Sequence, residues 1–292
     1  IKMALIGRNA VIFGVANQWS LAWAVAKKWH QSGANLALVC ASDRIAGSVK
    51  GLVERQHIEL NNGDNHSRSS NTVASSGGTI FDMTVHTCDI TSDKEVKDLI
   101  QELNDERFSN GKLHNVLHSV AFSPTGTLTK HYTDINFDEY SKTQDASAFS
   151  LVRVCKHAKS MLVAGGQDLE GGASILSLTF IGSTQIIPNY HVVGVAKSSL
   201  ESSTRYLAAE FGEHNVRVNT ISPGPINTAA ARGIPNFRDF EKNVKEKTLL
   251  KRNTMPEDVA SVATFLASDN SSCITGQTLY IDCGFNVTSP AT

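Results

Sequence analysis

The sequence predicts an α/β fold in which a parallel sheet is doubly wound, with helices on both of its faces. Short apolar runs alternate with helical patterns along nearly the whole chain, which is the order typical of parallel strands joined by helical crossovers. The runs are almost continuously apolar, as expected for strands that are covered on both faces. Sheets of this kind bind ligands beyond the carboxyl ends of their strands.

The first strand, helix and strand follow one another within about 30 residues, the length of one βαβ unit. Residues 10–14 form the first apolar run, a helical pattern covers 21–31, and 35–40 are apolar again. Gly33 ends the helix between them, because glycine favours the left-handed conformation that follows a helix. By the same reasoning we expect further strands at 85–90, 113–120, 174–179, 216–221 and 278–281. Further helices are expected at 93–103, 137–162 and 190–211.

Composition limits the possible classes of function. The chain has 292 residues, with 27 Lys or Arg against 28 Asp or Glu, so its formal net charge is −1. A nucleic-acid-binding surface needs an excess of basic residues, so we expect no nucleic-acid partner. No apolar run reaches the ~18 residues of a membrane span, and the cysteines form no CxxC pair, which favours reduced thiols. We therefore expect an intracellular soluble protein, in the cytoplasm or, if the N-terminus is processed, in the matrix of a mitochondrion or plastid.

One domain is expected to span residues 1–292, because the sequence shows neither an internal repeat nor a second apolar core. Asn, Ser, Gly, Thr and Asp dominate residues 61–79. Such a segment cannot bury apolar area, so it is expected to be a surface insertion. A second, smaller surface segment is expected at 165–172. These segments account for much of the length beyond a compact α/β domain.

The turn after the first strand, residues 14–22, reads GVANQWSLA and has one glycine instead of the three of GxGxxG. Gly14 permits a tight turn, Ala16 is small, and Ser20 is a good N-cap for the helix that follows. The free amides and the positive dipole end of that helix favour a pyrophosphate. An ordinary strand, turn and helix with a capping serine explains this stretch equally well.

The ends of the next two strands bear on the identity of a nucleotide. An acidic residue directly at the end of the second strand would bind the ribose of NAD, but Ala41 and Ser42 stand there. Ser42 and Arg44 are candidates to accept a 2′-phosphate, whereas Asp43 is also a suitable cap for the next helix. The choice between NADH and NADPH therefore stays open. Asp89, after the third strand, suits either the adenine amino group or a helix cap.

A tyrosine and a lysine lie seven residues apart at the start of the expected helix 190–211. At about 100° per residue this is two turns, so Tyr190 and Lys197 would share one face, about 10 Å apart along the axis. Next to a nicotinamide, such a lysine holds the ribose hydroxyls. The tyrosine donates a hydrogen bond or a proton to a substrate carbonyl. Taken alone, a pair at this spacing is usually coincidence.

Several motifs, taken in order, resemble those of the enoyl-[acyl-carrier-protein] reductases, which are divergent short-chain dehydrogenases with a Rossmann-like fold. The resemblance covers nearly the whole chain outside the two polar segments. Its most specific features are the six-residue gap between Tyr190 and Lys197 and a phosphate turn without GxG. The motifs are the turn at 14–22, CDI at 88–90, HSVAFSP at 118–124, PNYHVVGVAK at 188–197, SPGPINT at 222–228 and IDCGF at 281–285.

The resemblance implies hydride transfer from NADH or NADPH to a trans-2-enoyl thioester, the reductive step of type II fatty acid elongation. Tyr190 is implied to donate to the substrate oxygen and Lys197 to bind the ribose. With the residue arguments above, the candidate cofactor-binding residues are Gly14, Ala16, Ser20, Leu21, Ser42, Asp89, Ile90, Ser119, Val120, Ala121, Lys197, Pro225, Ile226 and Thr228. The candidate substrate-binding residues are Phe122, Phe180, Tyr190, Val193, Ala229, Ala230 and Ile234.

The resemblance also implies partners. A lid over the acyl chain is expected at about 226–246. Acyl carrier protein is expected to deliver the fatty acyl substrate, docking beside the lid through basic side chains such as Arg232. The family further implies a homotetramer that pairs the two long helices, 137–162 and 190–211.

Three positions depart from the family pattern. Phe180 stands where many relatives have a second tyrosine, Phe149 where tyrosine is usual, and Val193 where methionine is frequent. These departures leave the preferred acyl length open. Two alternative functions also remain: a catalytically silent, cofactor-binding subunit of a larger assembly, and an enoyl-CoA reductase. His114 and His118 are four residues apart, but they fall on an expected strand without a third ligand, so no metal site is expected.

Overall fold

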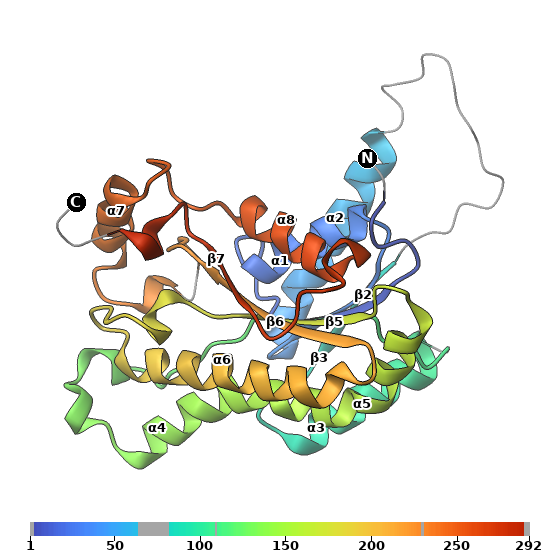
Figure 1. Cartoon of the computed structure of the whole chain (residues 1–292), viewed down its shortest axis with the longest axis horizontal. Coiled ribbons are helices and arrows are strands. Elements are labelled where there is room, and N and C mark those ends of the chain that lie inside the picture. The colour runs from blue at the N-terminus through green and yellow to red at the C-terminus, as the bar shows by residue number, and fades with distance from the viewer. Residues whose placement is uncertain (1–2, 64–81, 109, 229–230, 289–292) are drawn as a thin grey trace.

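One seven-stranded sheet forms the centre of the molecule (Figure 1). The computed structural model describes residues 3–63, 82–108, 110–228 and 231–288. The strand order is β3-β2-β1-β4-β5-β6-β7, and all neighbouring strands pair in parallel, so the predicted parallel α/β fold is confirmed. The strands are β1 (Asn9–Phe13), β2 (Asn35–Cys40), β3 (Met83–Thr87), β4 (Asn115–His118), β5 (Ala173–Leu178), β6 (Val216–Pro223) and β7 (Thr278–Ile281).

Helices cover both faces of the sheet, with α1, α2 and α8 on one side and α3, α5 and α6 on the other (Figure 1). Alternate residues of a strand enter opposite cores: Ala10 and Ile12 of β1 pack with the first layer, and Val11 and Phe13 with the second. No described helix has both the length and the apolar character needed to cross a membrane. The helices are α1 (Leu21–Gln31), α2 (Asp43–Gly63), α3 (Asp93–Glu102), α4 (Phe137–Gln144), α5 (Ser150–Asp168), α6 (His191–Gly212), α7 (Phe237–Lys247) and α8 (Pro256–Ala267).

Helix α1 shows how local sequence determines where a helix begins and ends. The Ser20 hydroxyl accepts a hydrogen bond from the Trp23 amide at 3.3 Å, which satisfies one of the free donors of the first turn. Gly33 has φ +92° directly after the helix, a conformation that favours glycine. The predicted bounds 21–31 therefore agree with the structure, as do those of β2 and β7.

Other bounds differ from the prediction for physical reasons. Strand β3 begins at Met83, two residues before the predicted 85–90, because its pairing with β2 starts at Leu36 and Met83. The predicted helix 137–162 is α4, a π-helical turn over Asp145–Phe149, and α5 in direct succession. Helices α7 and α8 were not predicted, and α2 was expected only as the helix that Asp43 would cap, without bounds.

The prediction of a surface segment at 165–172 holds only for its middle, because Gly171 and Gly172 at its end are buried, like the two glycines at its start. Helix α5 continues to Asp168, and both Gly165 and Gly166 are buried. A Cβ on Gly165 would lie 2.1 Å from the Leu113 carbonyl oxygen, and one on Gly166 would lie 2.4 Å from that of His214. The two glycines therefore let α5 lie against neighbouring backbone, and they do not mark a loop.

The order of the strands positions the functional site. From β1 the sheet extends to β2 and β3 on one side, and the chain returns on the other side at β4. The connections that leave β1 and β4 at their carboxyl ends lead to helices on opposite faces of the sheet, α1 and α5, so they diverge there. Such a switch point opens a crevice that is the usual ligand site of open parallel sheets.

Candidate functional site

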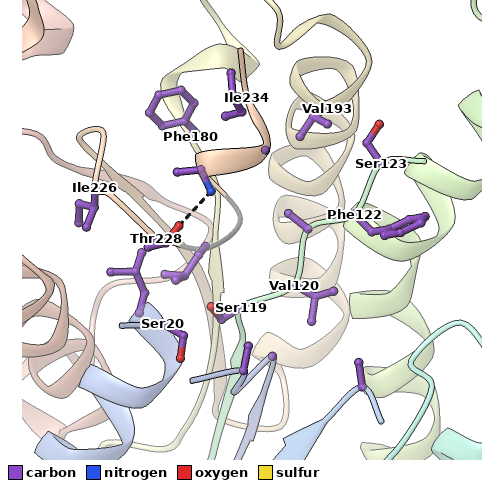
Figure 2. A pocket seen from close by; sticks show the side chains of 18 of the residues that line it. Ser20, Ser119, Val120, Phe122, Ser123, Phe180, Val193, Ile226, Thr228 and Ile234 are labelled. Atoms are coloured by element: carbon purple, nitrogen blue, oxygen red, sulfur yellow. Dashed lines mark hydrogen bonds between the residues drawn. The ribbon is translucent and has the colours of Figure 1, made fainter. Parts of the chain in front are cut away.

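A cavity of about 700 Å³ lies at the carboxyl ends of the central strands, a volume typical of sites for cofactors and small ligands. Figure 2 shows Ser20 toward one end of this pocket, with Phe180, Val193 and Ile234 toward the other. The cavity brings together most of the residues predicted from the sequence. These are Gly14, Ala16, Ser20, Leu21, Ile90, Ser119, Val120, Ala121, Phe122, Phe180, Tyr190, Val193, Lys197, Pro225, Ile226, Thr228 and Ile234.

Two of the predicted residues that the structure describes, Ser42 and Asp89, are not part of the lining. The Asp89 carboxylate accepts hydrogen bonds from the amide and hydroxyl of Thr91, at 2.9 and 2.7 Å, in a local turn. Ser42 precedes α2, and its carbonyl accepts from the Ala46 amide. Ala229 and Ala230 lie outside the described residues. At the two strand ends the cavity is instead lined by the preceding residues, Ala41 and Cys88.

The phosphate end of the cavity is shaped by one glycine and one helix. Gly14 has φ +90°, and a Cβ there would lie 2.1 Å from the Ser119 carbonyl oxygen. Only glycine therefore lets the end of β1 approach the end of β4 so closely. Ser20 lines the cavity at the start of the eleven-residue helix α1, whose dipole favours an anionic group. The residues at this end fit a dinucleotide.

Lys197 lies between the two ends, on the second turn of α6. Its Nζ donates to the Leu178 carbonyl at 2.8 Å and to the Val120 carbonyl at 3.2 Å, which leaves one of its three N–H donors for a ligand. Burial lowers the pKa of Lys197 to about 8, and the Glu201 carboxylate one turn further along opposes that change. The lysine thus keeps its charge at neutral pH in a buried position.

Tyr190 directly precedes α6, so it occupies the capping position and not the first helical turn. Its side chain is 8% exposed, and its ring meets Phe180 edge to face at 5.2 Å. A Cβ on Gly182 would lie 2.5 Å from the Tyr190 ring, so that glycine makes room for the phenol. Burial raises the pKa of Tyr190 well above its usual value, so the phenol keeps its proton. No described residue hydrogen-bonds to the hydroxyl, which is free to donate to a ligand.

Apolar side chains form the other end of the cavity. Tyr190 packs in one cluster with Val192, Val193, Leu128 and Phe180. A second cavity, of about 220 Å³, lies beside the first, and Phe180 lines both. The second cavity is closed by residues of α7 and of the loop before Tyr190. Phe180 therefore stands between the space in front of Tyr190 and a further apolar space.

The predicted lid segment, 226–246, contains more regular structure than its sequence suggested. A short 3₁₀ turn covers Ala231–Gly233, and α7 begins at Phe237. The Thr228 hydroxyl accepts from the Ala231 amide at 3.2 Å (Figure 2). Residues 226, 228, 231, 233, 234 and 237 line the cavity, so the segment forms one wall of it.

Sequence reasoning missed the part of the lining that packs beside the start of α6. Gly126, Leu128 and Thr129, in the loop after β4, line the cavity. No local pattern marks these residues, because they reach the cavity only through the crossing of that loop over α6. Cys40 also lines the cavity, at the end of β2, and burial raises its pKa to about 11, so it serves as apolar surface.

The histidines that share a metal-like spacing have ordinary partners. The His114 Nδ1 accepts from the Asn9 amide at 2.9 Å, and its Nε2 lies 3.1 Å from Asp168. The His118 Nε2 lies 2.7 Å from the Ser150 hydroxyl. Over the part of the chain that the structure describes, no three His, Cys, Asp or Glu side chains are grouped so as to hold a metal ion.

Comparison with known proteins shows the family to which the chain belongs. The family model described as "Enoyl-(Acyl carrier protein) reductase" matches residues 14–286. The chain is 36% identical over 289 residues to the "Enoyl-[acyl-carrier-protein] reductase [NADH] FabI" of Bacillus subtilis (strain 168), covering 99% of this chain and 100% of that protein. The protein of the same name from Synechocystis sp. is 36% identical over 286 residues, covering 97% and 98%.

Solved structures agree with the sequence comparisons. The Bacillus cereus enoyl-acyl carrier protein reductase with NADP+ and indole naphthyridinone has a TM-score of 0.84 at 33% identity, covering 99% of this chain and 100% of that one. The Anaplasma phagocytophilum reductase in complex with NAD has a TM-score of 0.82 at 31% identity, covering 98% and 97%.

Proposed function

Because the chain belongs to the enoyl-[acyl-carrier-protein] reductase family, we propose that it transfers hydride from a reduced nicotinamide dinucleotide to the β-carbon of a trans-2-enoyl thioester. It is an oxidoreductase of fatty acid biosynthesis, as the names of its relatives indicate. The observation that carries the proposal is the cavity itself. It joins a glycine turn and a helix N-terminus to a buried lysine and a free, protonated phenol.

The residues of the cavity fit a dinucleotide at one end. Gly14 lets the ends of β1 and β4 come together at this end of the cavity, and the start of α1 offers amides and a positive dipole end to the pyrophosphate. Lys197 keeps one N–H donor for the ribose hydroxyls. When bound, the nicotinamide supplies the hydride. Pro225, Ile226 and Thr228, beyond the end of β6, would border its ring.

Tyr190 and Lys197 divide the remaining work. As hydride reaches the β-carbon, negative charge develops on the thioester oxygen, and the Tyr190 hydroxyl donates a hydrogen bond to it. The phenol retains its proton because burial raises its pKa. The positive charge of Lys197 further stabilises the negative charge that develops on the thioester oxygen. The apolar surroundings of Tyr190 keep water out and strengthen both interactions.

Phe122, Phe180, Val193 and Ile234 form the substrate end of the cavity. Their apolar side chains suit an acyl chain, and they offer it no hydrogen-bonding side chain. Phe180 occupies the position where many family members carry a second tyrosine. Its ring contacts the Tyr190 ring edge to face, and this contact holds the phenol in position.

Acyl carrier protein is the proposed carrier of the substrate. Arg232, on the wall segment, is exposed, and its Nε donates to the Asn227 side chain at 2.9 Å. Further exposed basic residues follow on α7, including Arg238, Lys242 and Lys245. Asp239, Glu241 and Glu246 alternate with these basic residues, so the segment has a small excess of positive charge. This excess would attract an acidic carrier protein.

A homotetramer through the long helices is the proposed assembly. Aromatic side chains stand out from these helices: Phe137 of α4 is 82% exposed, and Tyr206 of α6 is 78% exposed. Exposed aromatic residues on one helical layer are typical of an interface between subunits. Sedimentation tests this assignment. We also propose an intracellular location, supported by cysteines that are all unpaired.

Oxidation of NADH or NADPH in the presence of a crotonyl thioester tests the proposed reaction. We expect loss of absorbance at 340 nm only when both substrates are present, with faster turnover of the carrier-protein thioester than of the CoA thioester. Absence of turnover with every combination would refute the proposal. Preference for the CoA thioester would favour the alternative of an enoyl-CoA reductase.

A further inference from the structure

His191, the first residue of α6, makes two hydrogen bonds of opposite kind. Its Nδ1 accepts from the Val192 amide at 2.8 Å, and its Nε2 lies 3.2 Å from the Lys130 carbonyl oxygen. An amide only donates and a carbonyl only accepts. The imidazole must therefore be neutral, with its proton on Nε2, for both bonds to form.

The Lys130 carbonyl belongs to the end of a cavity wall. We define the wall as residues 124–130, of which Pro124, Thr125, Gly126, Leu128 and Thr129 line the main cavity. Leu128 packs in the cluster that contains Tyr190. The wall therefore borders the substrate end of the cavity, away from the phosphate turn.

The wall is anchored on two sides. Toward α4, the Thr127 hydroxyl and the Lys130 ammonium group both meet the Glu139 carboxylate, at 3.3 and 2.6 Å. Toward α6, its only hydrogen bond among the described residues is the one from His191 to Lys130. The Tyr132 ring adds a tilted contact with the imidazole, at 5.6 Å between centroids. Without His191 the wall would keep its bonds to α4 and the packing of Leu128, but it would lose its hydrogen bond to the helix that follows Tyr190.

We propose that His191 is a positioning residue, which holds the 124–130 wall against the start of α6 and so sets the width of the acyl site in front of Tyr190. The inference rests on the proposed function, because the acyl site is that of the enoyl thioester. It assigns no contact between His191 and the substrate, since the imidazole is not part of the cavity lining.

Three variants distinguish the contributions of the two hydrogen bonds from that of the ring contact with Tyr132. His191→Gln keeps a donor able to reach Lys130, His191→Asn keeps only an acceptor for the Val192 amide, and His191→Phe keeps only the ring beside Tyr132. One net hydrogen bond corresponds to about three- to tenfold in an equilibrium constant. We expect KM for the enoyl thioester to rise by that factor in the Asn and Phe variants and to stay within twofold in the Gln variant. The kcat and the KM for NADH should stay within twofold in all three.

Amide hydrogen exchange measures how firmly the wall is held, and it does not require enzyme turnover. Amides of residues 124–130 should exchange faster in the Asn and Phe variants than in the wild type and the Gln variant. The proposal is wrong if exchange and KM are unchanged in His191→Phe, or if His191→Gln is impaired as much as His191→Phe. Failure of the wild type to reduce any enoyl thioester would instead refute the proposed function, and the exchange experiment would still decide the role of His191.

Discussion

Replacing Glu201 with glutamine removes the carboxylate that supports the charge of Lys197 while keeping the side chain's shape. Glu201 is 8% exposed and accepts a hydrogen bond from the Thr179 hydroxyl at 2.6 Å. The amide oxygen of glutamine accepts the same bond, so the fold should persist. Only the charge one helical turn from Lys197 is lost.

The size of the effect follows from Coulomb's law. Side chains four residues apart on a helix lie about 6 Å apart, and at an effective dielectric constant near 20 two unit charges then interact by about 3 kcal/mol. Allowing for partial compensation by solvent, this corresponds to about one to two pH units. Burial already lowers the pKa of Lys197 to about 8. Lys197 is charged below its pKa, so cofactor binding should weaken as pH rises through about 8 in the wild type and at lower pH in the variant.

The assay is kcat/KM for NADH against pH, because this ratio reports ionisations of the free enzyme. Two neighbours do not titrate in the range: burial lowers the pKa of His118 to about 3, and Tyr190 keeps its proton. We expect the alkaline limb to move down by about one to two pH units in Glu201→Gln. Glu210→Gln, on the same helix but paired with exposed Lys159, is the control and should leave the limb in place. A limb at the wild-type position in Glu201→Gln would refute the reasoning.

Two further predictions concern the ends of the cavity. Gly14→Ala should lower the free energy of unfolding by about 2–5 kcal/mol in urea titrations, because the new Cβ meets the Ser119 carbonyl at a φ of +90°. The control is Gly47→Ala, in open space on α2, which should leave the free energy of unfolding unchanged or raise it. Equal stabilities of the two variants would contradict the account. Phe180→Ala should join the two cavities, so the ratio of kcat/KM for a decenoyl thioester to that for crotonyl should rise about fourfold for each additional methylene buried. An unchanged ratio would show that Phe180 does not limit acyl length.

The sequence predicts the fold well where local signals decide it. Helix α1 has a capping serine before it and a glycine after it, and its predicted bounds agree with the structure. Helix α8 carries an equally clear start signal that was overlooked, with Pro256 at its first position and Asp258 accepting from the Met255 amide. In contrast, Gly165 resembles a loop residue until its contact with the Leu113 backbone is known. Such contacts between distant segments leave no local trace in the chain.

The candidate site was predictable to the extent that its residues stand next to strand ends. Gly14, Ser119 and Lys197 belong to motifs in which residue type and spacing match a known chemistry, and the cavity brings them together. Ser42 and Asp89 were predicted by the same logic but lie outside the lining. The side chain of Asp89 is occupied by a local turn, which spacing alone does not reveal. Leu128 lines the cavity through tertiary packing and carries no signal in the sequence.

Turnover of Tyr190→Phe tests the central claim most directly, because this change removes one hydroxyl and keeps the ring that packs against Phe180. The measurement is kcat/KM for the enoyl thioester, alongside the dissociation constant for NADH. We predict a fall of about 10²–10³-fold in kcat/KM, the usual loss for one donor to a developing oxyanion, with NADH binding unchanged within twofold. Wild-type turnover by Tyr190→Phe would contradict the assignment of Tyr190 as the donor to the substrate oxygen.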